Sequence, residues 1–149
     1  MAGDRGHLGQ RRVVLAHHGA GRWPTARHTH RGGVVEGAIW FGTGAGEQKF
    51  VNLNANSHVV LTTGTDQWDQ GIDVVIEGDA VRVNDDAVLA RVAAAFTTKW
   101  DGRWQYVARD GCFSDADRGG EVMVFAVTPV KVFAHAKGDP FGATTHRFS

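Results

Sequence analysis

The stretch FGTGAGEQKFVNLNANSHVVLTTG, residues 41–64, carries the strongest structural signal in the chain. Its pattern predicts a strand that ends at Thr43-Gly44, a short helix from Gly46 to Asn56, and a buried β-branched strand that ends at Thr63. A strand, a glycine-containing turn and a helix in this order leave backbone N–H groups and the positive end of the helix dipole at the turn. The stretch therefore predicts a place where an anion can bind.

Polar residues at this turn suit a bound phosphate. The Thr43 hydroxyl, the Gly44 backbone and the Lys49 ammonium can supply charge-assisted hydrogen bonds, and Gln48 and Asn52 lie beside them on the predicted helix. Two alternatives stay open: Thr and Gly that only cap and turn the chain, with a solvated Lys, and an Asn52 that bonds the local backbone. The spacing T-G-x-x-x-x-K-x-x-N-L lacks the second Gly and the Lys-Ser/Thr pair of a P-loop.

Short strands separated by turn residues continue along the chain and predict a barrel. One helix, Asp86 to Lys99, is predicted among them, with Asn84 or Asp85 as its N-cap and one apolar face. The predicted hairpins are Val34-Val35 with Ala38–Phe41 around Glu36-Gly37, Asp73–Ile76 with Ala80–Val83 around Glu77-Gly78-Asp79, and Val122–Val127 with Val130–Ala134 around Thr128-Pro129.

Composition limits the class of protein. The 149 residues suit one domain with a real core, and the 16 basic and 16 acidic side chains leave no electrostatic footprint for nucleic acid. No apolar run approaches the length that spans a bilayer, and the single cysteine, Cys112, cannot form an internal disulfide. We therefore expect a cytoplasmic protein that binds neither nucleic acid nor membrane. The histidines show no recognisable metal-ligand spacing, so no metal site is predicted.

The later segments strengthen the interpretation of the first. Together with residues 41–64, the stretches DVVIEGDAVRVNDDAVLARVAAAF, KWDGRWQYVARDG, VMVFAVTPVKVFAHAKG and the terminal THRF resemble the pyridoxamine 5′-phosphate oxidase-like family, in its flavin/deazaflavin oxidoreductase group. The resemblance covers Val34 to Ser149. It implies a mainly β split barrel of the FMN-binding type, with about six strands and two or three short helices. It also implies a homodimer that binds FMN or the deazaflavin coenzyme F-420 at its interface.

The resemblance implies roles for particular residues. Thr43 and Lys49 would contact the cofactor phosphate, and Arg147 would reach the site of the partner subunit, unless it belongs to a solvated tail. The cofactor ring performs the hydride chemistry in this family, so no catalytic side chain is expected. Large aromatic residues in polar loops are candidates to line the substrate pocket, with simple packing as the alternative: Trp68, Trp104 and Tyr106.

Residues 1–33 differ from the predicted barrel domain, residues 34–149. They show little periodicity and are rich in His, Arg and Gly. One explanation is a natural divergent tail that is disordered. The other is translation out of frame up to about Arg31: GC-rich codons for Leu15 to His28, read one base later, give W-L-T-T-V-R-A-D-G-R-P-H-V, which resembles the hairpin that opens the family's barrel. We favour the frameshift.

Two classes of function follow. The first is an oxidoreductase that passes hydride to or from a small organic substrate. Oxidation of pyridoxamine 5′-phosphate itself is disfavoured, because the sequence lacks the Arg-rich motifs expected for binding that substrate. The second is a non-catalytic split barrel that binds a flavin, haem or tetrapyrrole, or an inactive product of an N-terminal frameshift.

The frameshift hypothesis makes a prediction about the gene. The shifted frame of its first hundred or so bases should encode the hairpin W-L-T-T-V-R-A-D-G-R-P-H-V, because residues 15–28 are compatible with it codon by codon. Sequencing this part of the gene is the measurement. A shifted frame that encodes some other peptide, or contains a stop codon, rejects the hypothesis and leaves the divergent tail.

Overall fold

The computed structural model describes residues 13–17, 27–30, 32–115 and 119–149, and this part of the chain forms ten strands and two helices. Neither helix of the described part is long and apolar enough to cross a membrane. The strands are β1 Val13–His17, β2 Arg27–His30, β3 Gly32–Val35, β4 Ala38–Gly44, β5 His58–Thr63, β6 Gly71–Val83, β7 Tyr106–Arg109, β8 Cys112–Asp115, β9 Glu121–Lys137 and β10 Gly142–Arg147. The helices are α1 Gln48–Ala55 and α2 Asp86–Lys99.

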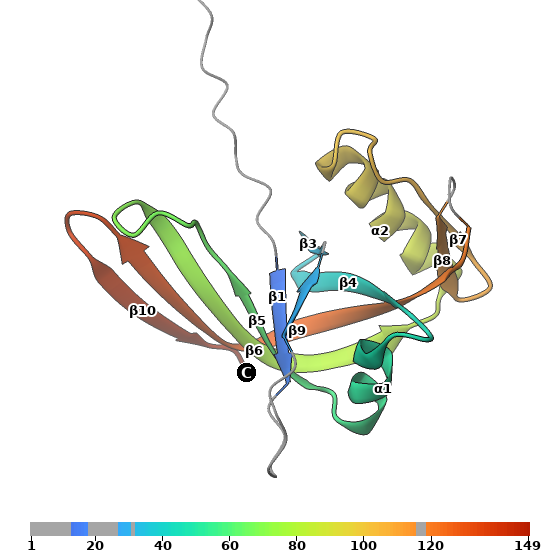
Figure 1. The fold of residues 1–149 in the computed structure, drawn as a ribbon, viewed down its shortest axis with the longest axis horizontal. Helices are drawn as coiled ribbons and strands as arrows, with labels where there is room; N and C mark the ends of the chain where they lie inside the picture. The colour runs from blue at the N-terminus through green and yellow to red at the C-terminus, as the bar shows by residue number, and fades with distance from the viewer. Residues whose placement is uncertain (1–12, 18–26, 31, 116–118) are drawn as a thin grey trace, which may run out of the picture.

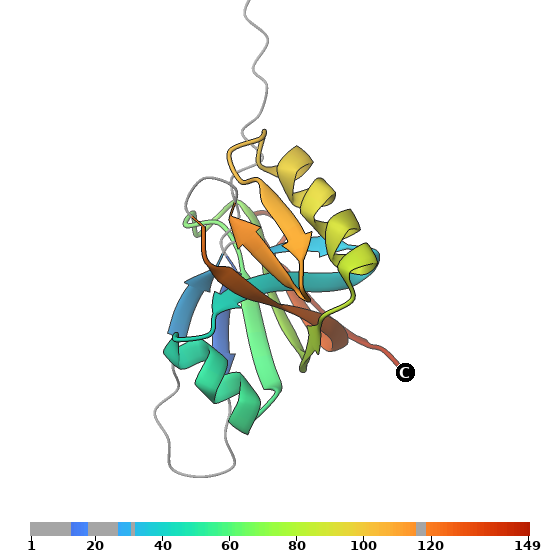
Figure 2. The same cartoon turned by 90° about the vertical axis from the view of Figure 1, so that its right-hand side faces the viewer.

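Two long strands, β6 and β9, organise the sheet. They pair antiparallel from Gly71↔Lys137 to Val83↔Val124, and the sheet order around them is β2-β1-β5-β6-β9-β4-β3. At one end the sheet curls and carries α1 and α2, as Figures 1 and 2 show. At the other end β6, β9 and β10 extend outward as a three-stranded ribbon, which we call the wing. The fold is thus mainly β, as the sequence predicts, with more strands than the six expected.

Two of the three predicted hairpins are wrong, because each is one continuous strand. Glu77-Gly78-Asp79 lies inside β6 and Thr128-Pro129 lies inside β9. These supposed turn residues face each other, as the pairs Gly78↔Pro129 and Asp79↔Thr128, beside a register shift that leaves Val130 as the extra residue of a bulge. At this point β9 also exchanges its other neighbour, from β4 to β10. Pro129, which has no N–H to donate, is tolerated there.

The other local predictions agree with the structure. β3 and β4 form the predicted hairpin, with Glu36 and Gly37 at positive φ in its turn. Helix α2 has the predicted bounds, and the Asp85 carboxylate caps it by accepting from the N–H groups of Ala87 and Val88, at 2.9 and 3.0 Å. Helix α1 begins two residues later than predicted and ends one residue earlier.

Two apolar clusters form the core. One fills the curled sheet beneath α1 and is centred on Phe41, Val59, Leu61 and Phe125. The other lies under α2, whose predicted apolar face is buried against the sheet there: Leu89, Val92 and Phe96 are all at most 4% exposed. Each helix therefore owes its position to burial of one apolar stripe.

The backbone of the N-terminal segment, residues 1–33, is described in strands β1 and β2 and in the first two residues of β3. β1 pairs with β5, from Val14↔Thr62 to His17↔Val59, and β2 pairs with β1. These stretches form strands that their lack of periodicity did not predict. The rest of the segment lies outside the described residues, and the hypothesis of a shifted reading frame stays a prediction about the gene.

The close approach of β6 and β9 predicts a selective loss of stability in Gly78→Ala. A Cβ at Gly78 would lie 2.5 Å from the Thr128 carbonyl oxygen and 2.8 Å from a Val127 methyl, so a strand must shift. We expect the free energy of unfolding to fall by about 1–3 kcal/mol, the usual effect of overpacking. Urea denaturation measures it.

Gly142→Ala in β10 is the matched control, because no atom of the described chain lies within 4 Å of its added Cβ. It should leave the free energy of unfolding nearly unchanged. Equal effects of the two substitutions would show that the Gly78 contact does not constrain the sheet.

Candidate anion-binding site

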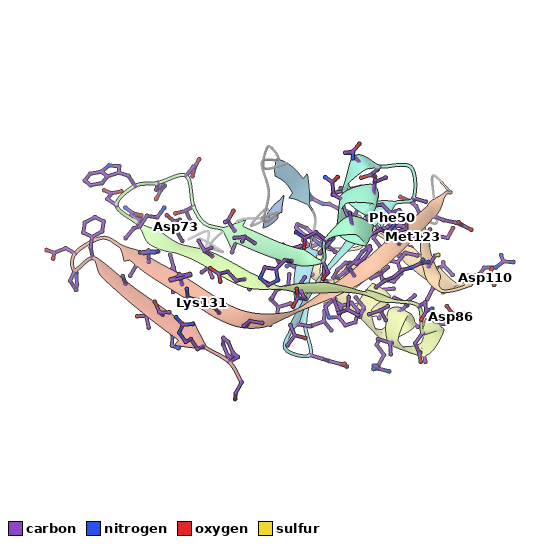
Figure 3. All side chains as sticks on the ribbon, turned by 90° about the horizontal axis from the view of Figure 1, so that it is seen from below. Phe50, Asp73, Asp86, Asp110, Met123 and Lys131 are labelled. Atoms are coloured by element: carbon purple, nitrogen blue, oxygen red, sulfur yellow. The ribbon has the colours of Figure 1, made fainter. Side chains whose placement is uncertain are left out.

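The predicted anion site lies where β4 ends and α1 begins. The chain turns tightly between them: the Glu47 N–H donates to the Gly44 carbonyl at 3.1 Å, and the Phe50 N–H donates to the Glu47 carbonyl at 3.0 Å. Helix α1 is held over the sheet by Leu53, which is 4% exposed, and by Phe50, whose ring meets the Phe125 ring edge-on at 6.3 Å. Figure 3 shows Phe50 at this end of the molecule, together with Met123 of β9. Core packing therefore fixes the helix start.

Two polar side chains at this junction are buried. Thr43 is 2% exposed and Lys49 is 8% exposed, and among the described residues they are the buried polar or charged ones. Both were predicted from the sequence as the phosphate contacts. Because α1 begins at Gln48, Lys49 is its second residue and not one turn inside, as the expected start at Gly46 implied.

The position of Lys49 is unfavourable for folding alone. A cation in the first turn faces the positive end of the helix dipole, and burial removes an ammonium from water. A solvated surface Lys, the alternative considered from the sequence, would suffer neither cost. The burial of Lys49 therefore rejects that alternative and indicates that this cation has an anionic partner.

In the structure the anionic partner is Glu47. Its Oε2 lies 2.8 Å from the Lys49 Nζ and accepts from the Thr43 hydroxyl at 3.2 Å. Its Oε1 accepts from the Gly44 N–H at 3.3 Å. The hydrogen bond from Lys49 lowers the pKa of the Glu47 carboxyl below its ordinary value, partly offset by desolvation and helped by the Gly44 N–H, so the group is ionised at neutral pH.

The donors at this junction fit a phosphate. An ammonium, a hydroxyl and a backbone N–H converge on one carboxylate, which stands in for an oxyanion, and the first turn of α1 adds N–H groups without intrahelical acceptors. The Glu47 side chain is 53% exposed, and no described residue lies within 4 Å of a Cβ built on Gly46, so the described part of the chain leaves the solvent side of this junction open. The remaining helix candidates, Gln48 and Asn52, hydrogen-bond to each other at 3.0 Å along α1.

The structure places the other predicted residues elsewhere in the chain's fold. Trp68 is 78% exposed, in the β5–β6 connection at the end of the wing, where it stacks on Phe141 with ring centroids 6.3 Å apart. Figure 1 shows that end of the wing and α1 at opposite sides of the molecule. Arg147 ends β10, and Figure 2 separates the C-terminal end from α1. The segments that carry these two residues therefore lie away from the start of α1 within one subunit.

Trp104 and Tyr106 belong to the second apolar cluster. Tyr106 stacks on Phe113 with ring centroids 4.9 Å apart and interplanar angle 14°, and Trp104 stacks on Tyr106 at 6.3 Å. Both pack against the cluster under α2. Their predicted role in a substrate pocket stays a prediction, and it would require a site that extends beyond the residues around Lys49.

Glu47 is the one member of the site that the sequence analysis missed. The signal for it was an acidic residue directly before a helix start, where it faces the positive end of the helix dipole. Among the described residues, no group of three or more His, Cys, Asp or Glu side chains is arranged to hold a metal ion.

Comparison with known proteins identifies the fold. No protein-family profile and no curated protein matches the sequence. Solved structures do match: general stress protein 26 from Bacillus anthracis str. Sterne has a TM-score of 0.62 at 12% identity, covering 94% of this chain and 91% of that one. A conserved hypothetical protein from Mycobacterium tuberculosis has a TM-score of 0.61 at 22% identity, covering 82% and 74%.

A third similar structure identifies the type of fold. A Clostridium acetobutylicum protein related to general stress protein 26, described as of the pyridoxinephosphate oxidase family, has a TM-score of 0.61 at 11% identity, covering 92% of this chain and 85% of its own. At such identities the likeness establishes the fold and nothing finer. The chain therefore has the split-barrel fold of pyridoxamine 5′-phosphate oxidase-like proteins.

Proposed function

We propose that this protein is a flavin- or deazaflavin-dependent oxidoreductase that holds the phosphate of FMN or coenzyme F-420 at the start of α1. The observation that carries the proposal is the burial of Lys49 beside Thr43, in a helix turn where only an anion makes a buried cation favourable. The split-barrel fold and the sequence resemblance of residues 34–149 to flavin and deazaflavin oxidoreductases support it.

The residues of the site would hold and orient the cofactor. The Lys49 ammonium, the Thr43 hydroxyl and the Gly44 N–H bind phosphate oxygens, and Gln48 and Asn52 lie next to them on α1. A bound flavin or deazaflavin supplies the hydride chemistry, so the protein needs no nucleophile or acid–base pair of its own. The substrate would be a small organic molecule, with Trp68, Trp104, Tyr106 and Arg147 as candidates to contact it or the cofactor from either subunit.

We further propose a homodimer, on the basis of the wing. On β6 and β9, one face of the wing is apolar and continues from the barrel core: Ile76 packs against that core, and cross-strand neighbours extend the face outward. Yet this face is not buried, since Ile72 is 43% exposed. Its members on β6 and β9 are Ile72, Val74, Ile76, Val132, Ala134 and Ala136, and β10 adds Gly142, Thr144 and His146 at its edge. The opposite face carries charged residues such as Glu77 and Lys131, so a second copy is expected on the apolar one.

Lys49→Ala tests the cofactor site. It should weaken FMN binding by about 1.5–3 kcal/mol, the value of a hydrogen bond to a charged group, while riboflavin, which lacks the phosphate, binds as before. Fluorescence titration with both flavins measures the effect. Lys131→Ala, which removes a wing lysine 4.0 Å from Glu77, is the control and should bind FMN as the unmodified protein does.

A wild-type protein that binds neither FMN nor F-420 would reject the proposed cofactor. Equal FMN affinity of Lys49→Ala and the wild type would remove Lys49 from the site. A Soret band in the protein as purified would instead support the non-catalytic haem or tetrapyrrole binder.

Ile72→Glu tests the dimer. A carboxylate on the apolar face of the wing should be desolvated at an interface, so the variant should be monomeric at a concentration where the wild type is dimeric. Size-exclusion chromatography with light scattering measures the mass. Val107→Glu, at a similarly exposed valine of β7 (54%), is the control and should remain dimeric. A monomeric wild type, or dimers of all three proteins, would contradict this interface.

A further inference from the structure

We propose that Glu47 is a built-in competitor for the anion site: its carboxylate occupies the phosphate position in the free protein and must leave before a phosphate binds. The inference rests on the proposed function and assigns a new role within it, that of a specificity-determining residue. It makes the site refuse small free anions and accept a phosphate that the rest of a ligand delivers.

The contacts of Glu47 are those of a ligand. Both of its oxygens are used, Oε2 by the Lys49 ammonium at 2.8 Å and by the Thr43 hydroxyl at 3.2 Å, and Oε1 by the Gly44 N–H at 3.3 Å. A phosphate at the same place would need the same three donors. Since the donors cannot serve both oxyanions at full strength, the carboxylate and the phosphate compete.

The carboxylate has solvent beside it into which it can move. The Glu47 side chain is 53% exposed, although its Lys49 partner is only 10% exposed, so one end of the ion pair is fixed in the protein and the other faces solvent. The fold of the turn does not require the carboxylate, because the turn is closed by backbone hydrogen bonds from the Glu47 and Phe50 N–H groups. Helix α1 likewise begins without a side-chain cap from Glu47.

Glycine at position 44 allows the carboxylate to lie in the site. A Cβ built on Gly44 would approach the Glu47 Oε1 to 3.3 Å and the Cδ to 3.8 Å, so the glutamate folds back directly over the Gly44 backbone. This contact brings the carboxylate against the N–H that a bound oxyanion would use. The absence of a side chain at Gly44 therefore leaves room for the Glu47 carboxylate as well as for a bound phosphate.

Tethering explains the selectivity. Glu47 is part of the chain, so its effective concentration at Lys49 far exceeds that of dissolved anions. Inorganic phosphate has no other binding group, so it must compete with this high effective concentration of the Glu47 carboxylate through the phosphate contacts alone. The phosphate of FMN is also tethered once the flavin ring has bound, and it carries nearly two charges against one on the carboxylate. Only such a delivered phosphate displaces Glu47.

The test is the affinity ratio of FMN to riboflavin, which isolates the contribution of the phosphate. In Glu47→Gln, which keeps an acceptor oxygen but removes the charge, the ratio of FMN affinity to riboflavin affinity should rise by roughly two- to fivefold, the range for loss of a partly exposed competing ion pair. Riboflavin affinity itself should not change. Inorganic phosphate should displace FMN from Glu47→Gln at lower concentrations than from the wild type.

Controls separate this role from a structural one. Glu36→Gln removes an exposed glutamate that lies 3.3 Å from Arg91, and it should leave the ratio unchanged. If Glu47→Gln does not fold, Glu47→Asp is the second variant, since it keeps the charge but shortens the reach. It should raise the ratio of FMN affinity to riboflavin affinity by a smaller factor. A glutamate that only stabilises the turn would lower the melting temperature and leave the ratio as it is.

The outcomes distinguish the two proposals. A wild type that binds FMN no tighter than riboflavin rejects the phosphate site itself. A wild type that prefers FMN, with a ratio that is unchanged or lower in the Glu47 variants, keeps the phosphate site and overturns the competitor.

Discussion

The pairing of β6 with β9 is the constraint on which the rest of the structure depends. Through their inner halves these strands contribute to the barrel core, and through their outer halves they form the wing. β5 attaches to one of them, and β4, β8 and β10 attach to the other. The pairing continues through the bulge because Gly78 lets the Thr128 backbone approach more closely than any side chain would permit. Gly78 therefore helps the β6–β9 pairing to continue from the barrel into the wing.

This long-range pairing also explains where sequence prediction failed. Hairpin β3–β4, helix α2 and its Asp85 cap depend on residues close in sequence, and local patterns predicted them. Glu77-Gly78-Asp79 and Thr128-Pro129 have the composition of turns, but each is extended because the other lies opposite it. No local rule contains that information, since the two segments are about fifty residues apart and each looks like a turn on its own.

In the candidate site, too, local sequence predicted some features, and tertiary packing determines the others. Thr43 and Lys49 were predicted from a strand–turn–helix pattern, and their burial is what distinguishes the site from an ordinary capped turn. That burial depends on how Phe50 and Leu53 seat α1 on Phe125 and its neighbours, which the short helix does not reveal by itself. Trp104 was predicted as a pocket residue because its loop is polar, and its packing against the cluster under α2 depends on tertiary contacts that the loop sequence does not reveal.

The same packing determines the electrostatic environment of Lys49. Seating α1 on the core forces Lys49 into a buried position at the positive end of the helix, in the free protein as well as in any complex. A buried cation without a counter-charge is strongly destabilising, so Lys49 needs a counter-charge in the free protein, before any anionic ligand binds. Glu47, close in sequence and half exposed, supplies the charge in the free state and has solvent to move into. In the proposed competition, the free protein and the phosphate complex place the same carboxylate differently, and the affinity for phosphate is limited by the ion pair that neutralises Lys49 in the free protein.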